Sequence, residues 1–383
     1  MTYLITFCLS TLLVYFGGEC RGSLRTLLVS CGLLLPCILA GFRDVTVGTD
    51  TSAYALWTYN AASSMQLIPF MERYAAYSAP GYNLFTWALA NISSFGFYLG
   101  AMEVFFVVPC YLAMKRFLRG GEWICMLAVY LLLYAGSLNL MKQSIAIAFV
   151  LLSAVYAWQR RFAAFVALVA LGVSFHQTAL VGFLLYPAMA LLIQKPRRPK
   201  SSKWRGLIIG STIGLLLAGV FVFGRQLVIA FSGLKSSYEY QVGHIGEGSI
   251  NVSYLALAIF LVLAWWFCRD ADDDSSDALL AGVASGVLLR SHALYDFFFG
   301  AAVVGCMLMQ LDVVSLSLGR FGYYLGPFVS LSIARLYCCG DSSSRLVSAF
   351  FLLALSFFFM RTFVLLGGNQ IYPYVTSWGL TLF

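Results

Sequence analysis

Five short polar segments interrupt this chain of 383 residues, and each contains side chains that could bind a charged ligand or move a proton. They are RDVTVGTDTSAY at 43–54, NLMKQSIA at 139–146, FHQT at 175–178, GRFGYY at 319–324 and NQIYPY at 369–374. Guanidinium and ammonium groups beside Asp, His, Asn and Gln side chains are suited to binding an anion. The residue types therefore predict a site for an anionic ligand.

Several of these residues also have a purely structural interpretation. Arg43 and Asp44 could form an ion pair at the end of a membrane span, and Arg320 could extend its charge to the bilayer surface. Asp50 could cap a helix that begins just after it. His176, in a tight turn between two apolar segments, could be an ordinary hydrogen-bonding residue. No single segment decides between the two interpretations.

Lys142 and Arg361 are harder to explain without a ligand. Lys142 is predicted near the start of a helix, where the helix dipole makes a positive charge slightly unfavourable. Arg361 lies within the last apolar segment, where an ionisable side chain usually has a function. Both residues therefore strengthen the prediction of an anion site.

The elements that position these residues must be membrane helices. The chain is 61% hydrophobic and 10% charged, and its mean hydropathy is +0.85. A soluble domain is about 45–50% apolar and about 25% charged. We expect residues 1–383 to form one polytopic, all-α membrane domain that lipid covers. The net charge of +8 then belongs to the turns between helices and predicts no nucleic-acid partner.

Apolar runs of about 20 residues, enough to cross a bilayer, recur along the chain. About twelve crossings are predicted, near 3–18, 26–42, 95–114, 123–138, 140–158, 162–176, 177–193, 205–223, 252–268, 294–311, 321–338 and 346–366. Two shorter apolar stretches, 81–94 and 278–289, do not fit the regular alternation of crossings between the two sides of the membrane. We expect them to be re-entrant or interfacial helices, which are tolerated where protein surrounds the backbone.

Basic residues predict the orientation, because short turns rich in Lys and Arg stay in the cytoplasm. Such residues cluster in alternate turns, at Arg21 and Arg25, 115–119, 160–161, 195–205, and Arg335 and Arg345. Both termini then lie outside, together with two long outer loops, 43–80 and 224–251. All five polar segments fall on this same outer side, and their coincidence there favours a functional site.

Familiar catalytic motifs are not present. The sequence has no GxSxG, HExxH or P-loop motif, so a serine hydrolase, a zinc protease and an ATPase are not indicated. It also has no Cys/His cluster, and its aspartate-rich stretch, DADDDSSD at 270–277, falls in a predicted cytoplasmic turn and not on the outer side. We therefore expect neither a metal nor a cofactor, and charge neutralisation by Arg and Lys instead.

The polar segments, in this order, resemble the EpsG family of bacterial polysaccharide polymerases, a branch of the Wzy type. The R-x-x-x-x-G-T-D-x-x-x-Y element of that family matches Arg43, Gly48, Thr49, Asp50 and Tyr54. The resemblance runs nearly from end to end. Its further matches are Pro80, Gly81 and Tyr82, with Ala79 where an acid is usual; Asn139, Lys142, Gln143 and Ala146, with Lys where Arg is usual; Phe175, His176, Thr178, Ala179 and Leu180; Arg320 with Tyr324; and Pro373 with Tyr374.

This resemblance implies a multi-pass glycosyltransferase of the bacterial inner membrane, with the GT-C-like architecture of polymerases and ligases. Its active site would face the periplasmic, outer side. It would transfer a glycan from undecaprenyl diphosphate to the terminal sugar of another lipid-linked repeat unit, as in O-antigen, capsule or exopolysaccharide synthesis. The implied partners are the undecaprenyl-diphosphate-linked oligosaccharide, the lipid bilayer and a chain-length regulator.

Such a reaction needs a group that accepts the proton of the attacking hydroxyl and fixed positive charge for the departing diphosphate. Arg43, Lys142 and Arg320 are the expected cations. Asp50 or His176 is the expected base, and the ordinary pKa of a histidine, about 6.5, suits the role better. The remaining candidates for substrate binding are Asp44, Tyr54, Asn139, Gln143 and Tyr324, with Arg290 and Arg361 as reserve cations.

Other functions stay open. A lipid-linked oligosaccharide flippase or solute carrier would place polar residues near the middle of spans and on both faces, whereas these spans are nearly empty of charge. An O-antigen ligase would share the donor and the cations. An O-acyltransferase would need a different polar partner for its histidine within a span. The cations on the outer side of the membrane, where Lys and Arg are disfavoured, argue against a non-enzymatic scaffold.

Overall fold

A computed structural model describes residues 1–118, 120–192, 226, 250–268, 292–338 and 341–382. The predicted span 205–223, the predicted short helix 278–289, most of the outer loop 224–251 and Arg290 lie outside the described residues.

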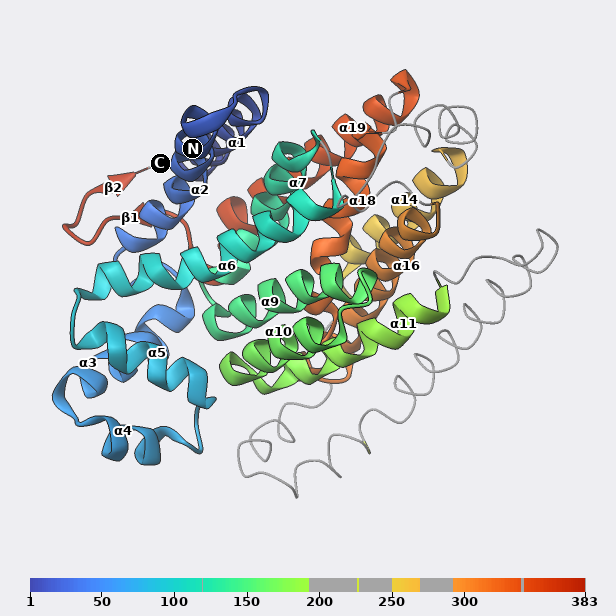
Figure 1. The fold of residues 1–383 in the computed structure, drawn as a ribbon. Coiled ribbons are helices and arrows are strands. Elements are labelled where there is room, and N and C mark those ends of the chain that lie inside the picture. The colour runs from blue at the N-terminus through green and yellow to red at the C-terminus, as the bar shows by residue number, and fades with distance from the viewer. Residues whose placement is uncertain (119, 193–225, 227–249, 269–291, 339–340, 383) are drawn as a thin grey trace. The chain divides into compact units, whose positions relative to one another are not determined.

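Helices form most of the described chain (Figure 1). The α-helices are α1 (Thr2–Glu19), α2 (Gly22–Gly41), α3 (Leu56–Ser64), α4 (Leu67–Tyr74), α5 (Pro80–Ala90), α6 (Phe95–Phe117), α7 (Glu122–Val129), α8 (Ala135–Ser137), α9 (Met141–Trp158), α10 (Phe162–Phe175), α11 (Leu185–Leu192), α14 (Val252–Cys268), α16 (His292–Leu308), α17 (Leu316–Gly319), α18 (Gly326–Cys338) and α19 (Ser342–Phe359). Wider, π-helical turns form η1 (Thr51–Ala55), η2 (Tyr130–Tyr134) and η8 (Met360–Leu365). Tighter 3-10 turns form η3 (Gln177–Leu184), η6 (Met309–Val313), η7 (Gly322–Tyr324) and η9 (Gly368–Gln370).

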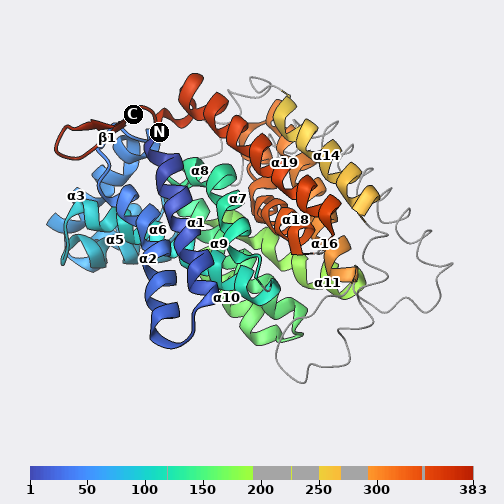
Figure 2. The same ribbon diagram turned by 90° about the horizontal axis from the view of Figure 1, so that it is seen from above.

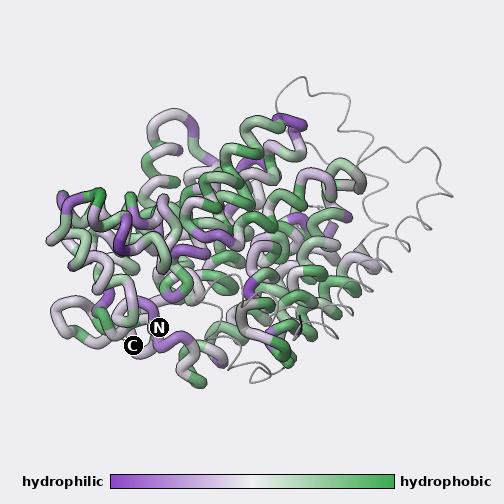
Figure 3. Tube along the Cα trace, turned by 90° about the horizontal axis from the view of Figure 1, so that it is seen from below, coloured by the Kyte–Doolittle hydropathy of each residue, from purple (hydrophilic) through white to green (hydrophobic). Residues whose placement is uncertain are grey.

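Apolar helices of membrane-spanning length confirm the prediction of an α-helical membrane protein. Within the described residues, six helical stretches are long and apolar enough to cross a bilayer: Thr2–Glu19, Gly22–Gly41, Phe95–Phe117, Met141–Trp158, Leu294–Val313 and Ser342–Leu365. Shorter apolar helices cover Glu122–Ser137, Phe162–Phe175, Gln177–Ala190 and Val252–Trp266. Within the described residues, each predicted span overlaps one or more helical elements, and the number of crossings stays a prediction. Figure 3 shows hydrophobic residues along most of the helical tube.

The predicted outer loop 43–80 is more regular than expected. It contains η1, α3 and α4, and the stretch 81–94, which was predicted to be a short helix, contains α5. A single hairpin interrupts the all-helical pattern near the C-terminus, where β1 (Tyr374–Val375) pairs antiparallel with β2 (Thr381–Leu382). The elements outside the spans are therefore ordered and can hold side chains in place.

The chain divides into two compact units. Unit 1 contains residues 1–186, 277–289 and 333–383, and unit 2 contains residues 187–276 and 290–332. In unit 1, α1 packs against α2, α2 against α6, α6 against α9 and α9 against α10, a succession that can be followed in Figures 1 and 2. In unit 2, α14 packs against α16.

Within unit 1, the C-terminal segment returns to the ends of α1 and α2 (Figure 1). The Tyr3 hydroxyl donates to the Ile371 carbonyl at 2.8 Å. The Tyr374 hydroxyl donates to the Leu39 carbonyl at 2.6 Å. The polar segment 369–374 is thereby fixed beside the start of the segment 43–54.

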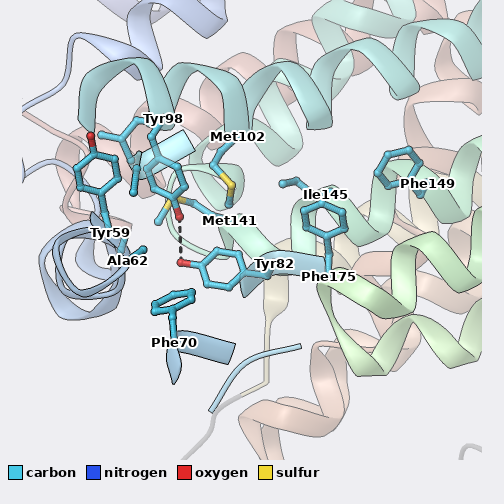
Figure 4. Close-up of a cluster of buried hydrophobic side chains, with 13 residues drawn as sticks. Tyr59, Ala62, Phe70, Tyr82, Tyr98, Met102, Met141, Ile145, Phe149 and Phe175 are labelled. Carbon is cyan, nitrogen blue, oxygen red and sulfur yellow. Dashed lines mark hydrogen bonds between the residues drawn. The ribbon is translucent and has the colours of Figure 1, made fainter. Parts of the chain in front are cut away.

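An aromatic cluster fills the space between α3, α4, α5, α6, α9 and α10 (Figure 4). The Tyr98 hydroxyl donates to the Tyr82 hydroxyl at 3.0 Å, and Thr58 lies 3.1 Å from the same Tyr82 oxygen. The phenol groups are thus hydrogen-bonded, as buried polar groups normally are. The cluster consists of Ala55, Tyr59, Ala62, Phe70, Tyr82, Ala90, Tyr98, Leu99, Met102, Met141, Ile145, Phe149 and Phe175.

Candidate functional site

Three of the five polar segments meet at the turn that begins α9. The side-chain amide of Asn139 donates to the Asn369 carbonyl at 3.1 Å, and its oxygen accepts from the Thr49 hydroxyl at 3.1 Å. The Tyr54 hydroxyl donates to the Asn139 carbonyl at 3.4 Å. Asn139, which was predicted to bind sugar hydroxyls, thus uses both amide atoms to join the segments 43–54, 139–146 and 369–374.

Gly48 allows the first segment to lie against this turn. Its φ of +86° belongs to the left-handed region, and an added Cβ would lie 3.0 Å from the Leu138 carbonyl and 3.1 Å from the Asn139 side-chain oxygen. Its N–H donates to the Gln370 carbonyl at 3.0 Å. A residue with a side chain would therefore be strained here and would push the segments apart.

Lys142 lies against two aromatic faces at this junction. Its ammonium nitrogen is 4.3 Å from the centre of the Tyr54 ring and 5.0 Å from the centre of the Tyr82 ring. Asp50 interacts with it electrostatically. Within the described part of the chain, the ammonium group contacts these rings and donates no hydrogen bond. Its three N–H donors can therefore be offered to oxygens of a ligand.

Asp50 faces this lysine instead of capping a helix. It stands directly before η1, but its side chain makes no capping hydrogen bond there. Burial raises the pKa of the Tyr54 hydroxyl well above its usual value, and the Asp50 carboxylate, which is hydrogen-bonded to it, raises that pKa further. Tyr54 therefore stays protonated. The structural interpretation of Asp50 as a helix cap is wrong.

Arg43 lies behind the same turn and is only 3% exposed. Its terminal nitrogen Nη2 donates to the Leu138 carbonyl at 3.3 Å and contacts the Met141 sulfur at 3.3 Å. Burial lowers the pKa of the guanidinium, and Glu103 opposes that change. A guanidinium keeps its proton in proteins, so the side chain stays charged. Arg43 thus supports the turn from the interior.

Asp44 and Gln143 also have definite places in unit 1. The Asp44 carboxylate accepts from the backbone N–H of Thr46 at 3.0 Å and from its hydroxyl at 2.8 Å. This is a local turn motif, whereas an ion pair between Asp44 and Arg43 had been considered. Gln143, in the first turn of α9, is 2% exposed. Gln143 keeps its predicted role in substrate binding as a proposal, whereas we assign Asp44 to this local turn and no longer propose that it binds substrate.

The polar segment 175–178 also lies near the start of α9. His176 follows α10, and its Nδ1 atom lies 2.6 Å from the Thr178 hydroxyl. Phe175 belongs to the aromatic cluster with Tyr82 and Met141 (Figure 4). An added Cβ on Gly81 would meet Ser174, so α5 and the end of α10 touch there. His176 is therefore near the segment that carries Lys142.

The polar segment 319–324 belongs to unit 2, and Arg361 belongs to unit 1. Arg320 is exposed, whereas Tyr324 is 1% exposed. Asp312 interacts electrostatically with Arg320, and its carboxylate occupies the space that a Cβ on Gly319 would need. Arg361 is exposed in η8.

Three buried or partly buried polar residues were missed by the sequence interpretation. Glu103 is 3% exposed and accepts from the Ser137 hydroxyl at 2.8 Å. Its presence inside an apolar run was a usable signal, since ionisable residues in spans are usually functional. Asn83 is 1% exposed, and both of its amide atoms lack a partner within the described structure. Neither Asn83 nor Asp312 had a distinguishing pattern.

Metal binding has no support within the described residues, where no three His, Cys, Asp or Glu side chains come together as a metal site. The geometry instead combines a partly buried ammonium group, two phenol rings, a carboxylate and, near them, an imidazole. Such a set can bind an anion and accept a proton.

Comparison with known proteins gives one match. The model of the EpsG family matches residues 26–376. No curated protein and no solved structure matches the chain. The matched range includes all five polar segments.

Proposed function

Because this chain belongs to the EpsG family, we propose that it is a Wzy-type polysaccharide polymerase, a glycosyltransferase of the bacterial inner membrane. The donor is a glycan linked to undecaprenyl diphosphate, and the acceptor is the terminal sugar of another lipid-linked repeat unit. The family supports a polymerase role in general, and the donor and the acceptor are parts of the proposal.

The observation that carries this proposal is the environment of Lys142. A partly buried ammonium group normally needs an anionic or hydrogen-bonding partner. Here the rings of Tyr54 and Tyr82 attract the cation through their faces, and Asp50 contributes negative charge. The N–H donors remain available to phosphate oxygens. The site is therefore prepared for a diphosphate and keeps its cation stable while no substrate is bound.

In the proposed reaction, the acceptor hydroxyl oxygen attacks the anomeric carbon of the donor glycan. The bond between that carbon and the diphosphate oxygen breaks, and the electron pair leaves with the lipid diphosphate. Lys142 stabilises the negative charge that develops on this leaving group. Arg361, also in unit 1, is a further candidate cation, and the role of Arg320 stays the prediction made from the sequence. Arg43 acts from behind the turn, because it is buried against Leu138 and Met141.

The hydroxyl proton passes to Asp50 or to His176. Asp50 is hydrogen-bonded to Tyr54 and acts electrostatically on Lys142, and its carboxylate is a group that can accept a proton. For His176 to act, its Nε2 atom must be unprotonated. The Nδ1 atom then carries the hydrogen and donates to Thr178, which would orient the ring. Each residue is one defined candidate for the base.

We propose that the active site lies on the periplasmic face of the membrane. The polar segments that meet at α9 lie at the ends of helices opposite to the basic turns, which the positive-inside rule assigns to the cytoplasm. An acceptor and a donor that both hang from lipid would reach such a site from the same side of the membrane.

A reconstituted reaction tests this function. Purified full chain in lipid vesicles is supplied with a defined lipid-diphosphate oligosaccharide, and glycan length and released lipid diphosphate are measured together. We expect multimers of the repeat unit and an equivalent amount of free lipid diphosphate. Movement of the substrate across the bilayer without a new bond would identify a flippase, and transfer only to an unrelated acceptor would identify a ligase. Either result would overturn the proposal.

Two aspartates six positions apart provide a matched comparison in this assay. D50N should lower turnover by at least about tenfold, because it removes the charge beside Lys142 and a candidate base. D44N should retain nearly full turnover, because an asparagine oxygen can still accept the local hydrogen bonds from Thr46. Equal effects of the two variants would remove Asp50 from the site.

A further inference from the structure

Beneath the Lys142 site, two oppositely charged side chains are buried in the interior of unit 1. Arg43 and Glu103 are each 3% exposed. Of the charged groups that act on Arg43, Glu103 has the largest electrostatic effect, and Arg43 acts on Glu103 in return. A buried charge without a counter-ion is strongly unfavourable. The two residues therefore depend on each other for burial.

Glycines bring the helices that carry this pair into contact. A Cβ added to Gly96 in α6 would lie 2.7 Å from the carbonyl of Gly41, the last residue of α2. A Cβ added to Gly100 would lie 3.2 Å from the Cys37 carbonyl. Small residues at i and i+4 permit this backbone approach in membrane helices. The acid lies one turn after Gly100, and the arginine two residues after Gly41.

Glu103 and Arg43 hydrogen-bond to two adjacent residues of the turn that precedes α9. Glu103 accepts a hydrogen bond from the Ser137 hydroxyl at 2.8 Å. Arg43 donates to the carbonyl of Leu138, the next residue, at 3.3 Å. The same turn continues through Asn139, which binds Thr49 and Asn369, to Lys142. Its position is therefore set from the interior by charged groups and from the outer side by hydrogen bonds.

We propose that Glu103 is the counter-ion of Arg43 and that the two form an internal positioning pair, which holds the 137–142 turn so that Lys142 faces its ligand. This inference rests on the proposed function for what Lys142 binds. Glu103 does not touch the substrate in this arrangement and is a positioning residue. The Nε atom of Arg43 has no hydrogen-bond partner within the described structure. Without Glu103, the guanidinium would lack a counter-ion as well.

The pairing is tested by thermal unfolding of the purified chain as wild type, E103Q, R43Q and the double variant R43Q/E103Q. Each single variant leaves one buried charge alone and should lower the melting temperature. The double variant should be more stable than the sum of the two losses predicts, because the effects of two electrostatically coupled residues are not additive. Additive losses would overturn the pairing. If E103Q does not yield folded protein, recovery by R43Q supports the pair and continued loss contradicts it.

The positioning role is tested by turnover in the vesicle assay, compared per amount of folded protein. E103Q should lower turnover about tenfold in the wild-type background, a common size of coupling between residues of one interaction network. The same change should have little further effect once Lys142 is replaced by alanine, because its influence passes through Lys142. An equal loss in both backgrounds would show a merely structural role. E72Q, the same chemical change on the exposed surface of α4, should leave turnover unchanged.

The outcomes separate this inference from the proposed function. If the wild-type chain forms no polymer, the proposed function fails, while the thermal measurements still decide whether Arg43 and Glu103 are a pair. If the wild type polymerises and the paired variants behave additively, only the further inference fails.

Discussion

At the scale of single residues, the site combines two charge pairs at different depths. The outer pair, Lys142 and Asp50, lies with Tyr54 and Tyr82 and can reach a ligand. The inner pair, Arg43 and Glu103, is buried. A nearly neutral arrangement at each depth explains how several ionisable groups can be held in an otherwise apolar protein.

Lys142 should be essential for turnover and replaceable in part by arginine. K142A should lower turnover by about a hundredfold or more, the usual cost of losing one group that stabilises a developing anion. K142R should stay within about tenfold of the wild type, because a guanidinium can also bind phosphate oxygens. Polymer formation in the vesicle assay measures both.

K115A supplies the control for this substitution. Lys115 is an exposed lysine in the last turn of α6, at the end that was predicted to be cytoplasmic. Its replacement should leave turnover intact. A K142A variant as active as K115A would remove the central cation of the proposed site.

At the scale of elements, backbone contacts decide where the polar segments go. The contact of α2 with α6 through Gly41 and Gly96 brings the first polar segment over the start of α9. The aromatic cluster then fixes α5 against α6 and α9. The segment 43–80 was predicted as a loop, but its helices cover this cluster. Tyr59 and Phe70 of this segment are buried in the cluster, whereas Trp57 is exposed.

A larger residue at the glycine contact should force these helices apart. G96L should destabilise the protein by about 1–3 kcal/mol, the usual cost of overpacking, since the backbone carbonyl of Gly41 cannot move aside as a side chain can. Thermal unfolding in detergent measures the change. G18L, on an exposed face of α1 with open space around the glycine, should unfold near the wild-type temperature, and equal shifts would contradict the close contact.

At the scale of the whole molecule, residues distant in the sequence build one site. The family match covers residues 26–376, and the C-terminal segment contributes to the site by binding back onto Gly48 and Asn139. The Asn369 backbone has a φ of 62°, a left-handed conformation that asparagine tolerates well. Its side chain donates to the Ala135 carbonyl at 3.2 Å, which fixes the segment in this conformation.

The orientation of unit 1 in the membrane can be measured by labelling. Ser377 and Ser23 are exposed near opposite ends of α2, since the Ser377 N–H donates to the Phe42 carbonyl and Ser23 lies in the first turn. In an active variant that has serine at all ten native cysteine positions, S377C should react with a membrane-impermeant thiol reagent in intact cells. S23C should react only after lysis. The reverse pattern would place the site in the cytoplasm.

The sequence by itself determined the membrane class, the positions of most helices and the polar segments, three of which the structure brings together. Hydrophobicity and length fix where a helix can cross lipid, and charged residues outside the expected turns are conspicuous in such a chain. Asp50, Tyr54, Asn139 and Lys142 were therefore found without a structure.

Only the tertiary structure decided how these residues are used. Whether a polar side chain faces a ligand or the interior depends on contacts between segments far apart in the chain, which no local pattern encodes. Such contacts turned Arg43 inward, committed the Asn139 amide to joining three segments, and made Glu103 part of the same arrangement. The physical reason is the close backbone approach at Gly48 and Gly96. This close approach brings charged groups together in the low-dielectric interior, where a charge without a partner is strongly unfavourable.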